Sequence, residues 1–260
     1  MEALNITASL GRRQILQGVS AIANPGELTA IAGPNGCGKS TLLRCVTGEI
    51  PYSGEVRLNG MNVAKQTPWK LAALRAVQPQ TAEVAFPFTV LEIVRLGLSA
   101  GLSAASSTLP FQALEAVDLA GFAGRFYQDL SGGKKQRVQL ARVLVQVWQP
   151  MAHGKPRWLI LDEPVSALDI GHQYTVMDLV KDYARRGGGV VAVMHDLNLT
   201  AMYADQVVLM QAGRVLADGP PQEVLTAENL STAYNCRVPV SAPAPAGLPY
   251  LLPQARGTAA

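Results

Sequence analysis

The sequence predicts an α/β fold whose core is interrupted by an inserted helical subdomain. Residues 28–32 form a short apolar run before a Gly-rich turn and a helical stretch, as expected for a buried strand. Residues 158–161 and 190–194 are two further apolar runs typical of strands, with a helical stretch between them. Strand, helix and strand in this order imply a right-handed parallel crossover. Between these two parts of the core, residues 82–150 have a helical character.

The N-terminal part alternates strands and turns. Residues 3–32 are expected to form strands around the turn signal Asn24-Pro25-Gly26. A helix is predicted from about residue 39 to residue 47, with Gly48 as its C-terminal cap. Residues 54–59 are expected to form another strand.

The inserted block is predicted to hold helices. One follows Pro87, a second is indicated by apolar residues at 114–119, and a third runs from about residue 132 to residue 149. The third carries four residues on one face at near-helical spacing, namely Val138, Ala141, Val145 and Trp148.

The C-terminal part resumes the core. A helix is predicted over residues 172–185, ended by the three glycines at 187–189. Residues 206–210 and 214–218 flank Gln211-Ala212-Gly213 in a hairpin pattern. After Val238 the chain is rich in Pro and Ala, so residues 238–260 are expected to be an irregular or loosely docked tail.

The composition narrows the functional classes. The 260 residues are 48% hydrophobic, yet the uncharged stretch 96–114 is too polar to span a membrane and is broken by Pro110. No secretory signal is visible, and the three cysteines fit neither a disulfide framework nor a zinc site, which favours a reducing, cytosolic setting. The net charge of +3 is scattered rather than gathered in a basic stripe, which disfavours nucleic acid as a partner.

Residues 33–40 match the phosphate-binding pattern G-x-x-x-x-G-K-[ST] in full, between a predicted strand and a predicted helix. Glycines let successive N–H groups face an anion at a helix N-terminus, where the helix dipole is positive. Lys39 would contact the β- and γ-phosphates of ATP, and Ser40 would ligate Mg²⁺. The expected ATP-binding residues of this segment are Gly33, Pro34, Asn35, Gly36, Cys37, Gly38, Lys39, Ser40 and Thr41.

Two carboxylates end the predicted strand 158–161. Asp162 at a strand end of an open α/β sheet is placed to hold Mg²⁺ through water. Glu163, the next residue, is placed to polarise the attacking water as a general base. A solvated acidic strand end is the alternative, and the preceding phosphate-binding loop argues against it.

The segment LSGGKKQ at residues 130–136 resembles the signature motif of ATP-binding cassette (ABC) ATPases, and it lies between the phosphate-binding loop and the acidic strand as in that family. The resemblance covers residues 1–237. It implies a P-loop NTPase core with an N-terminal antiparallel β subdomain and a helical subdomain at about 82–150. It also implies a head-to-tail homodimer, in which Ser131, Gly132 and Gly133 of one chain close over the γ-phosphate held by the other. Lys134 replaces the usual Glu or Gln, which should alter a rim contact only.

The same resemblance assigns further positions. Gln80 resembles the glutamine that senses Mg²⁺ and contacts the membrane partner, with Gln78 as the weaker candidate. Asp169 belongs to a loop that communicates between the two sites, and His195 resembles the switch histidine at the γ-phosphate. His153 and His172 match no functional position and are expected to be surface residues.

Two residues near the nucleotide depart from the family or invite a prediction of their own. Leu10 stands where the family has an adenine-stacking aromatic residue, so Leu10 could give an apolar contact to the base, or Arg12 or Arg13 could stack on it instead. Base selectivity is therefore expected to be loose. Cys37 lies near Lys39 and a helix N-terminus, which is expected to favour its thiolate and to make it reactive.

A single cassette without a membrane segment implies separate partners: two transmembrane permease subunits and, indirectly, a periplasmic substrate-binding protein. The extension at 147–157 and the segment 166–173 resemble those of bacterial haem importer ATPases. The resemblance therefore implies an ATP hydrolase at the cytoplasmic face of the bacterial inner membrane that energises haem import. The alternatives are a vitamin B12 or iron-siderophore importer and, further away, a non-transport ABC ATPase acting on ribosomes or DNA.

Overall fold

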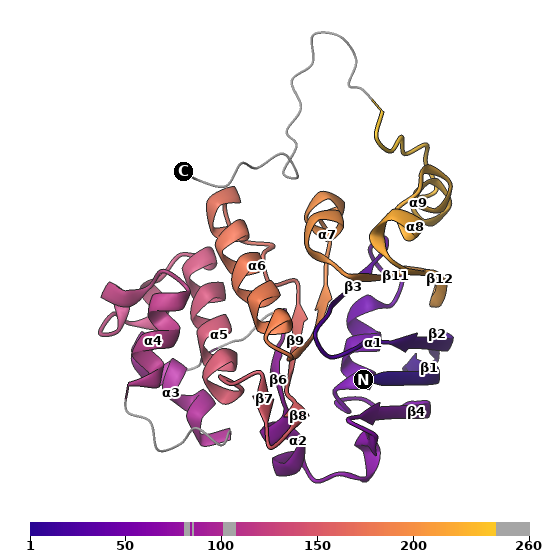
Figure 1. Ribbon diagram of the computed structural model, residues 1–260. Coiled ribbons are helices and arrows are strands. Elements are labelled where there is room, and N and C mark those ends of the chain that lie inside the picture. The colour runs from indigo at the N-terminus through magenta and orange to yellow at the C-terminus, as the bar shows by residue number, and fades with distance from the viewer. Residues whose placement is uncertain (81–83, 85, 101–107, 243–260) are drawn as a thin grey trace.

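A six-stranded sheet forms the centre of the computed structural model, which describes residues 1–80, 84, 86–100 and 108–242 (Figure 1). Only β11 and β12 pair antiparallel in this sheet, and every residue of β3, β9 and β10 is buried. The predicted parallel core is therefore confirmed. In spatial order the strands are β12 (Arg214–Gly219), β11 (Gln206–Gln211), β3 (Leu28–Ala32), β10 (Gly189–Val193), β9 (Trp158–Asp162) and β6 (Arg75–Gln78).

A second sheet is antiparallel and is built mostly from the N-terminus. Its strands, in the order β2-β1-β4-β5, are β1 (Glu2–Leu10), β2 (Arg13–Ile22), β4 (Ser53–Leu58) and β5 (Met61–Asn62). Helix α1 (Lys39–Val46) packs its apolar side into a core shared by both sheets. A short 3₁₀ turn (Val63–Lys65) and α2 (Pro68–Leu74) then lead the chain to β6.

A group of helices packs against the β6 side of the central sheet (Figure 1). It contains α3 (Val90–Ala100), α4 (Leu109–Ala116) and α5 (Gly132–Gln146), with 3₁₀ turns at Ala120–Phe122 and Tyr127–Asp129. The second predicted helix ends earlier than expected, since Leu119 is buried beyond the end of α4. The predicted subdomain boundaries at 82 and 150 stay a prediction, because part of this block lies outside the described residues.

The remaining helices follow the central strands. They are α6 (Ile170–Arg185), α7 (Leu197–Tyr203), α8 (Pro221–Val224) and α9 (Ala227–Tyr234). Among the described residues, no helix is both long enough and apolar enough to cross a membrane. Most of the expected tail, residues 243–260, lies outside the described residues.

The extension after α5 folds into a small hairpin, β7 (Met151–Ala152) paired with β8 (Lys155–Pro156). His153 and Gly154 form its tip with positive φ angles. The hairpin and the residue before it pack on Gly187 and Gly188: a Cβ on Gly187 would lie 3.0 Å from Met151 Cγ, and one on Gly188 would lie 3.0 Å from Pro150 Cβ. Gly187 and Gly188 therefore follow the end of α6 and leave room for the hairpin, whereas Gly189 begins β10.

Candidate nucleotide-binding site

The phosphate-binding loop connects β3 to α1 and depends on glycine at its ends. Gly33 and Gly38 have φ angles of 138° and 108°, which side chains other than glycine rarely adopt. A Cβ on Gly33 would lie 2.2 Å from the carbonyl oxygen of Met210, and one on Gly38 would lie 2.8 Å from Leu16. The loop is thus wedged between β11 and β2, and its shape is fixed by the fold around it.

Lys39, the first residue of α1, is held inside this loop. Its side chain is buried, and Nζ donates hydrogen bonds to the carbonyl oxygens of Gly33 at 2.8 Å and Pro34 at 3.1 Å. A buried ammonium must be paired, and these carbonyl groups supply the partners. The positive charge therefore lies at the N-terminus of α1, where the helix dipole adds to it.

Ser40 and Asp162 meet across the site from α1 and β9. Ser40 Oγ lies 3.3 Å from Asp162 Oδ1. Burial raises the pKa of the Asp162 carboxyl above its ordinary value, and the hydrogen bond from Ser40 opposes this shift. Oxygen donors of this kind are the ligands that Mg²⁺ prefers.

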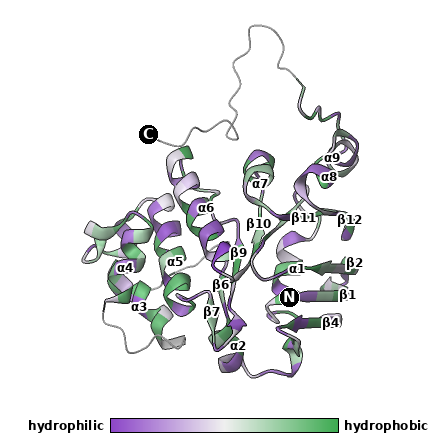
Figure 2. Cartoon of the chain, viewed as in Figure 1, coloured by the Kyte–Doolittle hydropathy of each residue, from purple (hydrophilic) through white to green (hydrophobic). Residues whose placement is uncertain are grey.

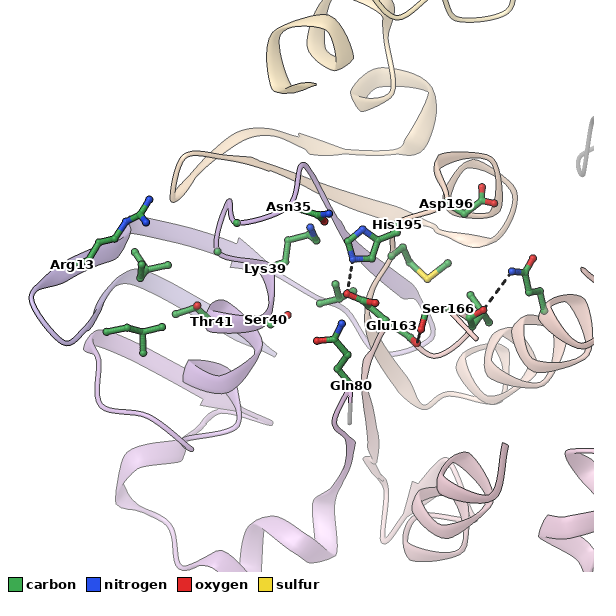
Figure 3. A pocket seen from close by; sticks show the side chains of 18 residues that line it. Arg13, Asn35, Lys39, Ser40, Thr41, Gln80, Glu163, Ser166, His195 and Asp196 are labelled. Carbon is green, nitrogen blue, oxygen red and sulfur yellow. Dashed lines mark hydrogen bonds and ion pairs between the residues drawn. The ribbon is translucent and has the colours of Figure 1, made fainter. Parts of the chain in front are cut away.

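Glu163 and His195 form a close pair between the ends of β9 and β10 (Figure 3). His195 Nε2 lies 2.5 Å from Glu163 Oε1. Glu163 has a φ angle of 54°, and its N–H donates to the carbonyl oxygen of Val193 at 3.2 Å. A non-glycine residue in this conformation is strained, and such strain gathers at functional sites. The neighbouring parallel strand thus fixes the backbone from which this carboxylate points into the pocket.

These residues line one pocket of about 850 Å³ (Figure 3). The predicted residues that line it are Leu10, Asn35, Gly36, Gly38, Lys39, Ser40, Thr41, Gln80, Glu163 and His195. Arg13 also lines it, whereas Arg12 is not among its described lining residues. Gln78 is buried away from the pocket and donates to the carbonyl oxygen of Gln136 at 3.4 Å. The wall is completed by residues that the sequence did not assign to the nucleotide pocket, namely Ile15, Val165, Ser166, Gln173, Val193, Met194 and Asp196.

The signature residues lie outside this pocket. Ser131 precedes α5 as its N-cap residue, but its side chain makes no capping hydrogen bond. Ser131 and Gly132 are exposed, whereas Gly133 packs against the loop after Glu163: a Cβ there would lie 2.8 Å from the carbonyl oxygen of Ala167. Within one chain, the signature residues therefore do not complete the pocket that holds Lys39.

Gln136 joins α5 to the loop after Glu163, and sequence reasoning assigned it no role. Its Nε2 donates to the carbonyl oxygen of Glu163 at 2.6 Å, and its Oε1 accepts from the N–H of Ala167 at 3.1 Å. One amide side chain thus satisfies two backbone groups of a loop that lies about 30 residues further along the chain. Its presence in the LSGGKKQ segment was the only signal in the sequence.

Asp169, predicted to communicate between sites, caps α6 within its own chain. Its carboxylate accepts from the N–H of His172 at 3.0 Å and lies 2.8 Å from the same residue's Nδ1. These hydrogen bonds lower the pKa of the Asp169 carboxyl.

The prediction that Cys37 favours its thiolate is wrong. The side chain is buried, and burial raises the pKa of the thiol above its ordinary value, while the nearby Lys39 charge opposes the shift without overcoming it. A nearby lysine and a helix N-terminus both lower the pKa of a thiol, but removal of water by the surrounding core raises it. The sequence shows the first two effects and not the third.

A glycine-rich loop at a helix N-terminus, a buried lysine and an acidic strand end define a P-loop nucleotide-binding ATPase. The sequence profile of the ABC transporter family matches residues 16–166. The chain therefore belongs to the ABC transporter family, and it is an ATP-hydrolysing member of that family.

Curated relatives align with this chain over nearly its full length. The hemin import ATP-binding protein HmuV of Jannaschia sp. (strain CCS1) is 58% identical, over 96% of this chain and 92% of its own length. The protein of the same name from Rhizobium meliloti (strain 1021) is 55% identical, over 98% of both chains. A solved nucleotide-free ATP-binding cassette from an ABC transporter has a TM-score of 0.75 at 26% identity, over 90% of this chain and 99% of its own.

Proposed function

We propose that this chain is the ATP-binding and hydrolysing subunit of a bacterial haem importer. The pocket that brings Lys39, Ser40, Glu163 and His195 together carries the ATPase part of the proposal. The relatives named for hemin import support haem as the cargo. Vitamin B12 and iron-siderophore complexes are the alternative cargoes of the same kind of importer.

Mg²⁺ fits the oxygen groups of the pocket. Ser40 and Asp162 would hold it, and the amide oxygen of Gln80 lies on the same pocket wall. Bound there, Mg²⁺ would offset the negative charge that builds up on the phosphates during transfer.

Glu163 would accept the proton of the attacking water, and His195 would hold that carboxylate in place. The bond of 2.5 Å between them fixes the orientation of Glu163, which catalysis by positioning requires. Lys39 would stabilise the phosphate oxygens from the N-terminus of α1. The chain's own groups thus supply a base, its orienting partner and a fixed positive charge.

The Glu163→Gln variant tests this assignment. It keeps the shape of the side chain but cannot accept a proton, so it should bind ATP as well as the wild type while kcat falls by about 100-fold or more. Binding is measured with a fluorescent ATP analogue and hydrolysis by phosphate release. Glu115→Gln, the same change at an exposed position of α4, is the matched control and should leave both unchanged. Wild-type turnover by Glu163→Gln would remove the assigned base.

We further propose that two copies of the chain share each site head to tail. The exposure of Ser131 and Gly132 supports this, because a second chain could then place them over the nucleotide held by Lys39. Asp169 lies in the loop next to Gly133, so it would take part in the same contact.

The permease would dock on the helical group and its border with the antiparallel sheet. A second pocket of about 850 Å³ lies there, with Tyr52, Arg75 and Gln146 among its lining residues. Most of the hydrophobic residues that Figure 2 shows along α3 and α4 are buried, but Leu96 and Phe111 are 49% and 47% exposed. Trp69 and Phe86 are each 69% exposed. These surfaces suit a hydrophobic partner, which we propose is a pair of permease subunits at the cytoplasmic face of the inner membrane, fed by a periplasmic binding protein.

Cargo is tested in the assembled transporter. The chain is purified with its permease, reconstituted in vesicles with the cognate binding protein, and assayed for ATPase activity with haem, vitamin B12 or a ferric siderophore added. Stimulation by haem alone would support the proposal. Stimulation by another cargo would show that the cargo is not haem, but the chain would still be an importer subunit. Co-purification with ribosomes or DNA instead of a permease would overturn both the haem assignment and the importer assignment.

A further inference from the structure

His172 lies between two carboxylates that come from different parts of the fold. Its Nδ1 is 2.8 Å from both carboxylate oxygens of Asp169, the N-cap residue of α6. Its Nε2 is 3.4 Å from Oδ2 of Asp118, which follows α4 in the helical group. The side chain is 31% exposed, so it is half-buried between these partners. His172 is thus a surface residue, as expected, but its ring lies against two carboxylates.

Two hydrogen bonds from the ring to carboxylates would need a proton on each ring nitrogen. A carboxylate only accepts hydrogen bonds, and a neutral imidazole carries a single N–H. Both contacts can therefore be hydrogen bonds only in the imidazolium form. It follows that a neutral ring can keep only one of the two hydrogen bonds, whereas a ring with both N–H groups keeps both.

The two carboxylates are themselves anchored to functional elements. The buried Arg137 of α5 donates to the carbonyl oxygens of Val117 at 2.8 Å and Asp118 at 3.0 Å, and lies 3.4 Å from Oδ2 of Asp118. Asp169 ends the loop that begins at Glu163. A chain of polar contacts thus runs from α5, the signature helix, through Asp118 and His172 to that loop.

The charges around His172 are therefore two negative groups and one positive group. Asp118 and Asp169 face its ring, and Arg137 lies behind Asp118. The two lysines near the start of α5 lie against aromatic rings instead, Lys134 over Phe122 and Lys135 over Tyr127. Within the described residues, both ring nitrogens therefore face carboxylate oxygens.

We propose that His172 is a proton-dependent positioning residue for ATP hydrolysis, which fastens the loop from Glu163 to Asp169 to the helical group through Asp118. The inference rests on the ATPase activity and on the contacts above, and it does not depend on the cargo. His172 and Asp118 are not among the described residues that line the nucleotide pocket, so they act on the loop and leave ATP binding alone.

A double-mutant cycle at two pH values tests the proposal. The rates of ATP hydrolysis of the full-length chain, of His172→Gln, of Asp118→Asn and of the double variant are compared at about pH 6 and about pH 8. Ion pairs of this exposure are worth up to about 1 kcal/mol, so each single variant should lower kcat about two- to five-fold at the lower pH. The two effects should not add, because both changes break the same contact. At the higher pH the coupling between them should fall toward zero. The dissociation constant of an ATP analogue should stay unchanged throughout.

Two controls separate this role from a loss of folding. His153→Gln removes the exposed histidine at the hairpin tip and should leave the pH profile of hydrolysis as in the wild type. Thermal unfolding at each pH reports whether the variants are folded, and Asp118, with 74% of its side chain exposed, offers a second route to break the contact without disturbing the core. The proposal is overturned if His172→Gln lowers kcat equally at both pH values, if it has no effect at either, or if its effect persists unchanged in the Asp118→Asn background.

Discussion

Burial governs the chemistry of the cysteines. Cys37 and Cys45 are 4% and 0% exposed, and burial raises the pKa of the Cys37 thiol and moves that of Cys45 to about 11. The thiolate is the reactive form, so raising the pKa lowers the reactive fraction at neutral pH. We expect maleimide to label the exposed Cys236 quickly and the other two slowly, as mass spectrometry of the intact protein would measure. Cys236→Ser should abolish the rapid phase. A rapid modification of Cys37 from which ATP protects would contradict this account.

Base selectivity depends on Leu10 and Arg13. Both line the nucleotide pocket, and Leu10 is 44% exposed, so it offers apolar contact but no ring on which a base can stack. Wild-type hydrolysis of ATP and GTP should therefore be of similar efficiency. Arg13→Ala should weaken binding of both nucleotides by about two- to five-fold if its guanidinium stacks on the base. Arg12→Ala is the matched control and should not change either affinity. A strict ATP preference in the wild type would show that another contact reads the base.

At the scale of elements, the hairpin and the end of α6 form one packed unit. A Cβ on Gly188 would lie 2.3 Å from Tyr183 Cε1 and 3.0 Å from Pro150 Cβ. Gly188→Ala should thus lower the free energy of unfolding by about 1–3 kcal/mol through overpacking, as measured by denaturant unfolding. Gly121→Ala is the control and should change stability little, because an added methyl group there meets none of the described residues within 4 Å. Equal denaturant midpoints of unfolding for the two variants would mean that the hairpin moves aside without loss of stability.

Gln136 is the contact through which α5 can set the position of Glu163. Replacing its amide by a carboxylate in Gln136→Glu removes the donor to the Glu163 carbonyl oxygen and places an acceptor against an acceptor. We expect kcat to fall by about 10-fold or more while ATP binding is preserved. Gln112→Glu makes the same change on the exposed side of α4 and should be silent. If Gln136→Glu hydrolyses ATP at the wild-type rate, the loop keeps its position without this amide.

Short sequence motifs were enough to predict the centre of the site, because its key residues lie within a few contiguous segments. The phosphate-binding loop and the acidic strand end were found from spacing alone, and the fold places Lys39, Ser40, Asp162 and Glu163 together as expected. Contacts between distant segments could not be predicted in this way. Gln136 and His172 have partners that are fixed only by the packing of α5 and α4 beside the loop from β9 to α6. The small hairpin was missed for a similar reason, since each of its strands has only two residues.

The error on Cys37 has a different origin. Its sequence neighbours, a lysine and a helix start, were identified correctly, but the sign of a pKa shift depends on how much water the fold removes. Leu16 and Met210, from distant parts of the chain, belong to the apolar core around this loop. The residues that exclude water from Cys37 are distant in sequence, so the residues next to Cys37 in the sequence do not reveal this desolvation.

At the scale of the whole molecule, the groups of the proposed shared site lie at two separate places. Lys39 and Glu163 face the nucleotide pocket, whereas Ser131 lies outside it at the start of α5. If a second copy completes the site, then a chain with a damaged pocket still carries an intact signature segment, and the reverse also holds. Two inactive chains should in that case restore each other.

Mixing Lys39→Ala with Ser131→Ala tests this consequence. Each variant alone should hydrolyse ATP poorly, because both sites of its homodimer lack one essential group. The mixed dimer has one site with both groups intact, so an equal mixture should recover roughly a quarter of wild-type activity if the subunits exchange at random and the sites act independently. Phosphate release after co-incubation measures this.

Mixing Lys39→Ala with the double variant Lys39→Ala/Ser131→Ala is the control, since none of its dimers contains an intact pocket. Failure of the first mixture to gain activity over its parts, with subunit exchange demonstrated by cross-linking, would mean that each chain completes its site alone or that hydrolysis needs both sites together. The two possibilities are separated by a mixture of wild type and Ser131→Ala, in which only a requirement for two sites predicts a loss beyond the fraction of damaged sites.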